Sequence, residues 1–274
     1  MKREELFVAE DAESTEILII RIVLSAISAC SAVKQLFRAG LTVLFALGIL
    51  LVPAHAGADL KSAIAAYKRG DYGFALHEFR RLAEKGNPKA QRMLADMYEG
   101  GAGLPRDYAE AFKWYLLAAR NGDVFAQFMV AQMYYEGKGG PKDQQAAFKW
   151  YGMAAEKGHI YAQHNLGALY ELGTGVAKSK ADAFRWYLKA AQRGLGEAQH
   201  KVGRLYSTGD GVGQDLVKAY YWLDLSASGG NQQAARDRDS LSEGMKPDEL
   251  LRAKALAEKR PAAEGGKPGA RETK

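Results

Sequence analysis

The chain has little of what small, stapled or fibrous proteins depend on. It has a single cysteine, Cys30, so a framework of disulfides is excluded. Its 7 prolines against 30 glycines exclude a collagen-like chain. Neither sign of charge dominates, and the net charge of +6 is mild for a protein that binds nucleic acid. With 47% hydrophobic and 26% charged residues, the composition predicts a globular protein with no nucleic-acid partner.

Two apolar stretches open the chain, and the second has the layout of a secretory signal. Lys34 and Arg38 precede an apolar run from Ala39 to Val52, which is too short to span a membrane comfortably. Ala54 and Ala56 then place small residues at the two positions that a signal peptidase reads. We therefore expect cleavage after Ala56 and a periplasmic or secreted protein, which contacts a membrane only if this segment is retained.

A signal peptide normally begins a chain, whereas this one would begin at Val33. We therefore expect a targeting region over residues 1–56, with the signal peptide at residues 33–56 and an upstream part that reflects a start site placed too early. Two alternatives stay open. Both apolar stretches could be membrane anchors, or Cys30 could carry a lipid, although Arg21 disfavours the lipid.

One interval, 36 residues, recurs through the rest of the chain. Repetition at a fixed interval of this size is typical of solenoid proteins. Several columns of identical residues share one register, which excludes coincidence. The columns are Trp114, Trp150, Trp186 and Trp222; Gly86, Gly122, Gly158, Gly194 and Gly230; Ala75, Ala111, Ala147, Ala183 and Ala219; Ala83, Ala119, Ala155, Ala191 and Ala227; Ala90, Ala126, Ala162, Ala198 and Ala234; Gln91, Gln127, Gln163 and Gln199; and Tyr98, Tyr134, Tyr170 and Tyr206.

Each column has a physical task in a helical hairpin. A short oxygen-bearing side chain precedes a first helix of about 13 residues and can cap its free backbone N–H groups. The glycine column ends that helix in a left-handed conformation, and a second helix follows, such as Phe125 to Tyr135. Glycine pairs then build the loop to the next unit. The caps are Asp71, Asp107, Asp143, Ser179 and Asp215, and the pairs are Gly101 and Gly103, Gly137 and Gly139, Gly173 and Gly175, and Gly209 and Gly211.

Two helices cannot bury their apolar faces alone, but stacked hairpins can. The sequence therefore predicts an all-α, right-handed α-solenoid with five repeats over residues 71–246 and a disordered tail over residues 261–274. We expect a leading helix at residues 57–70 and a closing helix at residues 247–260, whose apolar residues cover the last hairpin. We also expect each tryptophan to be buried between neighbouring hairpins, so that Trp150→Ala costs roughly 3–5 kcal/mol. The covering residues are Leu250, Leu251, Ala253, Leu256 and Ala257.

The pattern Ala-Phe-Lys-Trp-Tyr-x-x-Ala-Ala-x-x-Gly-x-x-x-Ala-Gln, closing with Tyr-x-x-Gly-x-Gly, resembles the Sel1-like repeat, a relative of the tetratricopeptide repeat. The interval of 36 residues and the glycine pair favour it over the tetratricopeptide form of about 34 residues. The resemblance covers Asp71 to about Asp239. It implies a helical scaffold that binds other proteins, and bacterial relatives are often exported adaptors. Some cysteine-rich relatives are linked to penicillin binding, but this chain lacks their cysteines.

Motifs for catalysis, cofactors and metals are weak. The run from Gly209 to Gly213 has no preceding strand and no Gly-Lys-Ser/Thr ending, so we expect no nucleotide site. His164 and His200 share one column but lack further ligands, and we interpret them as solvated positions. Acidic pairs such as Asp237 and Asp239 are interpreted as surface. We expect no catalytic residue, no cofactor and no metal.

The residues that vary between copies lie on the surface of the predicted solenoid, and we expect them to carry the function. Basic heads mixed with Leu, Met and Tyr flank the apolar stripe of the first helices and suit an extended or helical segment that carries some acid. We predict that these residues line a concave groove for a protein or peptide partner; the alternative is that they are solvated helix positions. The residues are Lys113, Leu116, Leu117, Lys149, Met153, Arg185, Leu188, Lys189 and Tyr221.

The leading hypothesis is therefore a non-enzymatic, exported scaffold that binds a protein partner, such as a periplasmic regulator of an envelope or signalling protein. A hydrolase that acts on cell-wall or β-lactam substrates is the alternative from another class. Its usual Ser-x-x-Lys motif occurs only from Ser31 to Lys34, inside the predicted signal peptide. A structural spacer without a ligand is the third possibility.

Overall fold

The computed structural model describes residues 59–259, which form twelve α-helices and contain no β-strand. The predictions for the targeting region and for the C-terminal tail lie outside these residues. Among the described helices, none is both long enough and apolar enough to cross a bilayer. The helices are α4 (Leu60–Lys68), α5 (Tyr72–Glu84), α6 (Pro88–Gly100), α7 (Tyr108–Arg120), α8 (Val124–Glu136), α9 (Gln144–Glu156), α10 (Ile160–Leu172), α11 (Lys180–Gln192), α12 (Gly196–Thr208), α13 (Leu216–Ser228), α14 (Gln232–Gly244) and α15 (Pro247–Glu258).

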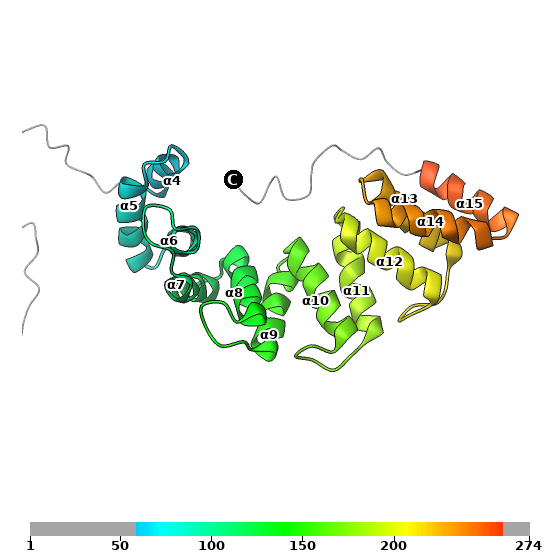
Figure 1. The fold of residues 1–274 in the computed structure, drawn as a ribbon, viewed down its shortest axis with the longest axis horizontal. Helices are drawn as coiled ribbons and strands as arrows, with labels where there is room; N and C mark the ends of the chain where they lie inside the picture. The colour runs from blue at the N-terminus through cyan, green and yellow to red at the C-terminus, as the bar shows by residue number, and fades with distance from the viewer. Residues whose placement is uncertain (1–58, 260–274) are drawn as a thin grey trace, which may run out of the picture. The chain divides into compact units, whose positions relative to one another are not determined.

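Each helix packs against the next one along the chain, from α4 to α14 (Figure 1). The described part is thus a row of antiparallel helix pairs, which confirms the predicted α-solenoid of helical repeats. The odd-numbered helices α5 to α13 are the predicted first helices, and the even-numbered helices α6 to α14 are the second. Packing continues without interruption from one pair to the next, so no hairpin stands alone.

The predicted caps begin all five first helices. Each of these helices is 13 residues long, and the cap side chain accepts a hydrogen bond from a backbone N–H in the first turn. Asp107, for example, accepts from Ala109 at 2.9 Å and from Glu110 at 3.0 Å. After each first helix the predicted glycine has a positive φ, as at Gly122 with 92°. Local sequence therefore sets both ends of these helices.

The glutamine column has a task that the sequence did not reveal. The side-chain amide of Gln127 is buried and donates a hydrogen bond to the carbonyl of Ala119, at 3.1 Å. That carbonyl lies in the last turn of α7, where helical carbonyls lack a partner within the helix. Three further copies repeat the bond at 3.0–3.2 Å. The glutamines thus tie the end of each first helix to the second helix that follows.

The second glycine of each pair is required for two reasons, its backbone conformation and its close contact with the preceding repeat. Gly139 has a φ of +75°, and a Cβ there would collide with the carbonyl oxygen of Tyr108, at the start of α7. Gly175 is in the same position against Gln144, at the start of α9. Only glycine combines a left-handed backbone with so close an approach. The loops are therefore seated on the preceding repeat and help to set the spacing of the row.

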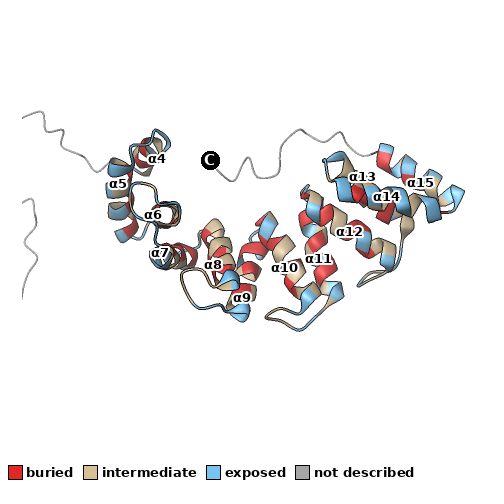
Figure 2. Cartoon of the chain, in the orientation of Figure 1, coloured by how far each residue is buried: buried red, intermediate tan, exposed pale blue. Residues whose placement is uncertain are grey.

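The core differs from the prediction in one respect. The tryptophans do lie between repeats, because Trp114 and Trp150 each pack against two successive hydrophobic clusters. However, all four are only half-buried, so the prediction that they are core residues was wrong in degree. The next residue along is the buried ring: Tyr115 and Tyr187 are 1% and 0% exposed. Figure 2 shows such buried positions on successive helices of the row.

The C-terminal end is more polar. Within α14 only Ala234 is buried, and α15 packs against α13. Ala253 and Ala257 are buried and Leu250 packs on the same cluster, as the prediction of a covering helix requires. Leu251 and Leu256 are 70% and 40% exposed, so their assignment to the covered face was wrong.

Candidate binding surface

From α7 onward, each first helix places one large, buried side chain between two successive second helices. We call these places junctions and number them along the chain. Each is named by the buried residue at its floor, and the four floor residues are spaced by 36. They are Tyr115 between α6 and α8, Tyr151 between α8 and α10, Tyr187 between α10 and α12, and Leu223 between α12 and α14.

Hydrogen bonds and an ion pair between charged side chains close the first junction. The hydroxyl oxygen of Tyr115 lies 2.5 Å from a carboxylate oxygen of Asp96 and 2.9 Å from one of Glu99, both on α6. Glu99 also accepts a hydrogen bond at 2.7 Å from the ammonium of Lys138, in the loop that follows α8. A tyrosine, a glutamate and a lysine thus link α7, α6 and the next repeat.

The third junction has the same chain of contacts with one carboxylate. Tyr187 donates a hydrogen bond at 2.7 Å to Glu171 on α10, and Lys201 on α12 pairs with that carboxylate at 2.9 Å. Burial would raise the pKa of Glu171, but the hydrogen bonds from Tyr187 and Lys201 outweigh it and the pKa is lowered. The carboxylate therefore stays ionised and joins three helices.

The second junction lacks this bridge and is open. The position of Glu99 and Glu171 is occupied by Tyr135, and that of Lys201 by Asn165. A hollow with a volume of about 260 Å³ lies there, which we call the α8–α10 hollow. Its lining is Phe128, Gln132, Tyr135 and Glu136 of α8, Tyr151 of α9, and Asn165, Ala168, Leu169 and Leu172 of α10.

Aromatic rings make the floor and one wall of the α8–α10 hollow. The rings of Phe128 and Tyr151 lie 5.8 Å apart, and His159 stacks on Phe128 at 4.5 Å. His159 is also the cap of α10, because its Nδ1 accepts from the backbone N–H of Ala162 at 3.2 Å. Burial raises the pKa of Tyr151 to about 12, against a lowering by its hydrogen bond with Asn165, so its hydroxyl is neutral at physiological pH. The floor is thus aromatic and uncharged.

The rim of the α8–α10 hollow combines exposed apolar groups with one acid. Tyr135 is 37% and Leu172 is 66% exposed, which is high for side chains of this kind. Glu136 accepts a hydrogen bond from the amide of Gln132 at 2.9 Å. The hollow can therefore receive an apolar side chain, and its rim can pair with a cation or an N–H group beside it.

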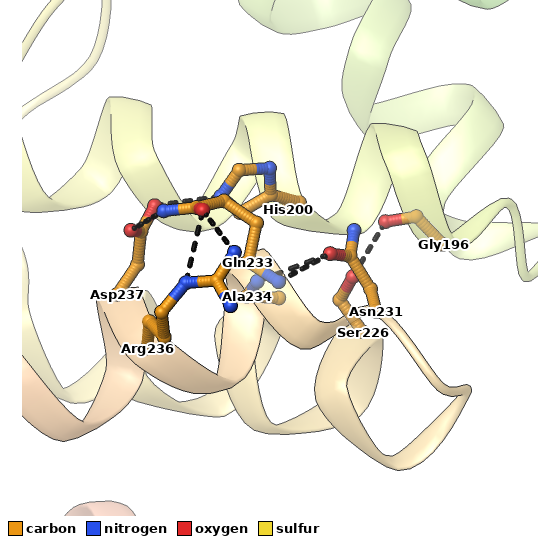
Figure 3. Close-up of polar contacts among 8 residues, drawn as sticks. All are labelled: Gly196, His200, Ser226, Asn231, Gln233, Ala234, Arg236 and Asp237. Carbon is orange, nitrogen blue, oxygen red and sulfur yellow. Dashed lines mark hydrogen bonds and ion pairs between the residues drawn. The ribbon is translucent and has the colours of Figure 1, made fainter.

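The fourth junction is polar, and its contacts are drawn in Figure 3. The Nε2 of His200 on α12 lies 2.7 Å from Asp237 on α14, and Gln233 donates to the same carboxylate at 2.7 Å. Two predictions fail here. His200 is a link between repeats with 14% of its side chain exposed, not a solvated position, and Asp237 is its partner rather than free surface. The contact joins His200 and Asp237, which lie in neighbouring repeats and in different columns. A comparison of residues within one column could therefore not predict it.

The nine residues predicted for the partner groove lie on the first helices α7, α9, α11 and α13. Three of them, Leu116, Leu188 and Tyr221, are half-buried. The other six are exposed: Lys113, Leu117, Lys149, Met153, Arg185 and Lys189. The structure places none of the nine in the lining of the α8–α10 hollow. A role for them in binding stays a prediction.

Local contacts occupy several of these nine side chains. Lys113 pairs with Glu110 at 2.5 Å and Arg185 with Asp182 at 3.2 Å, each within its own helix. The ammonium of Lys189 lies 3.9 Å from the ring centre of Trp186. Exposed pairs of this type are weak and easily exchanged for a partner's charge, so they neither support nor oppose binding.

Residues 59–259 contain no group of three or more His, Cys, Asp or Glu side chains that could hold a metal ion. The Gly209–Gly213 run is the loop after α12, where Gly209 and Gly211 repeat the left-handed glycines of the other loops. The repeat explains these glycines, as the sequence predicted.

The Sel1 repeat family model matches four consecutive units, residues 88–123, 124–159, 160–195 and 196–231. Each unit begins with a second helix and ends with the next first helix. No curated protein matches the chain.

Two solved structures are similar. One is c5321, a protective antigen present in uropathogenic Escherichia coli strains with an SLR fold, at 31% identity and a TM-score of 0.64 over 71% of this chain and 44% of that one. The other is a Sel1 repeat protein from Oxalobacter formigenes, at 29% identity and a TM-score of 0.65 over 74% of this chain and 86% of that one. The chain thus spans less than half of the E. coli protein. Together with the four matched units, its helical row makes this chain a member of the Sel1-repeat family.

Proposed function

We propose that this chain is a non-enzymatic scaffold and that the α8–α10 hollow binds an apolar side chain of a protein partner. One observation carries the proposal: of the three junctions floored by tyrosine in residues 59–259, the second alone lacks the Glu–Lys bridge, and a hollow lies at the place of that bridge. Sel1-repeat proteins are generally scaffolds that bind other proteins, which makes a protein the class of partner to expect.

The chemistry of the hollow supports the same choice. A volume of about 260 Å³ is enough for one large apolar side chain, but it is small for a site that encloses a drug-sized molecule. Aromatic residues such as Tyr135 are enriched where proteins bind one another, because they bury much area at little entropic cost. Leu172 adds a flexible apolar edge.

The proposed place of action is outside the cytoplasm. Its support is the basic start, apolar run and small residues that end at Ala56. In that compartment the scaffold would hold an envelope or secreted protein. Determining the N-terminal residue of the protein recovered from the cell envelope tests this part, and an N-terminus upstream of residue 50 contradicts it.

Peptides selected from a displayed random library on the full-length chain test the hollow. Ala168→Leu fills it from within and Leu172→Asp removes the apolar edge, so each should weaken the selected peptides at least about tenfold. Leu251→Asp on α15 is the matched control, because Leu251 is equally exposed but far along the row, and it should leave affinity unchanged.

The same peptides decide between the two surfaces. A variant with Lys113, Lys149, Arg185 and Lys189 all changed to Glu reverses the charge of the predicted groove without touching the hollow. If that variant loses binding while Ala168→Leu keeps it, the partner uses the first helices and the proposal for the hollow is wrong.

A further inference from the structure

The first junction holds more acid than one hydroxyl can satisfy. Tyr115 has a single hydroxyl hydrogen, yet its oxygen lies within hydrogen-bond distance of both Asp96 and Glu99. That hydrogen can serve one carboxylate well. If the other were ionised too, it would face the lone pairs of the phenol oxygen at 2.5 or 2.9 Å with no hydrogen between them. An additional proton on one carboxyl group completes both hydrogen bonds.

The surroundings decide which group carries that proton. Glu99 already has a cation of its own, because the ammonium of Lys138 lies 2.7 Å from its carboxylate. Asp96 faces Arg92 on its own helix at 3.5 Å, but Arg92 also pairs with Asp123, in the turn before α8, at 3.3 Å. Asp96 therefore shares the Arg92 cation with Asp123 and is the better site for the proton.

The net effect of burial and of the neighbouring groups also favours the protonated form of Asp96. Burial raises the pKa of Asp96 most, and the charges of Glu99 and Asp123 raise it further, while Tyr115 and Arg92 lower it, with a result of about 6. On α4, burial raises the pKa of Tyr67 most, and the charge of Asp96 raises it further.

The other junctions provide an internal comparison. At the third junction the position of Asp96 is held by Ala168, so Tyr187 serves Glu171 alone and no proton is in excess. At the second junction that position is Gln132, which bears no charge. The conflict over one hydrogen is therefore confined to the first junction.

We propose that Asp96, Tyr115 and Glu99 share one additional proton, and that its loss on going from acidic to neutral pH loosens α6 from α7. The sign follows from linkage. A carboxyl group whose pKa is raised in the folded state stabilises that state below its unfolded pKa, and this stabilisation is lost as pH rises through the folded value. The junction is thus tight in acid and weaker near neutrality, the reverse of an ordinary salt bridge.

Two measurements on the full-length chain test the proposal. In ¹³C NMR with labelled aspartate, the Asp96 carboxyl should titrate near 6, and a midpoint at or below its ordinary value of 3.8 overturns the proposal. Hydrogen exchange, corrected for its intrinsic pH dependence, should show amides of α6 and α7 losing at least about fivefold of their protection between about pH 5 and pH 7.5. Amides of α10 and α11, at the third junction, should change little.

Asp96→Asn supplies the matched variant, because its amide can donate to the phenol oxygen at every pH. Protection of α6 and α7 in this variant should no longer depend on pH. If it falls with pH as in the natural chain, or if the natural chain shows no fall, Asp96 does not govern the junction. The aspartate titration needs no variant and decides the matter if Asp96→Asn fails to fold.

Discussion

The second and third junctions are built on the same frame and end in opposite states. Both have a buried tyrosine at the floor, Tyr151 and Tyr187, and both lie between second helices of equal length. Two columns separate them: Glu171 and Lys201 close the third junction, while Tyr135 and Asn165 at the same positions leave the second open. The repeat sets the place of each junction, and the residues at these two variable positions distinguish the open junction from the closed one.

The first junction shows that the lysine that closes a junction need not come from the same position of the repeat. Its lysine, Lys138, comes from a loop, whereas Lys201 of the third junction comes from a helix. Different positions thus supply the same charge to the same kind of glutamate. Because lysines from two different positions form the same ion pair, we infer that a junction closes when its glutamate is paired, wherever the lysine comes from.

Removal of the floor residue should give the largest effect and should differ between the two states. Tyr187→Ala loses a fully buried ring and a hydrogen bond to a charged group, so it should cost about 4 kcal/mol. Tyr151→Ala should cost about 3 kcal/mol, because its ring already borders the α8–α10 hollow. Urea unfolding followed by circular dichroism measures both. A larger loss for Tyr151→Ala would show that the second junction is not the looser one.

Much of the frame could be predicted from sequence, because its determinants are local. A cap such as Asp107 and a glycine such as Gly122 act within a few residues of their own helix, and the interval of 36 fixes the rest of the row. The family resemblance, the helical class and the two ends of the first helices followed from these signals and were confirmed.

The candidate site could not be found in this way, because it depends on contacts between repeats. The predicted groove residues were chosen for varying within the first helices, but the α8–α10 hollow is made mostly by the second helices. One signal was present in the sequence: Glu99, Tyr135 and Glu171 share a column that varies in charge. Its meaning required knowing that Lys138 and Lys201 reach that column from elsewhere.

Truncation of a tryptophan should lower the free energy of unfolding by an intermediate amount. It tests how much the residues between two junctions contribute to stability. Trp150 packs against the clusters on either side of it but is half-buried. Trp150→Ala should therefore cost about 2 kcal/mol, below the range for a fully buried ring. The same unfolding experiment measures it, and a cost at or above that of Tyr187→Ala would restore the tryptophans as the main core residues.

The smallest change in stability should come from converting the open junction into a closed one. Tyr135→Glu combined with Asn165→Lys copies the pair Glu171 and Lys201 into the second junction. A partly exposed pair of this kind should add no more than about 1 kcal/mol of stability, and less at high salt because the charges are screened. The change in binding should be far larger, because the new pair replaces the tyrosine of the rim and occupies the hollow.

Tyr135→Gln with Asn165→Met is the control: it has similar side-chain lengths without the charges, and it should keep more of the peptide affinity. Equal losses in the two double variants would mean that Tyr135 itself, rather than the absence of a bridge, distinguishes the open junction from its neighbours.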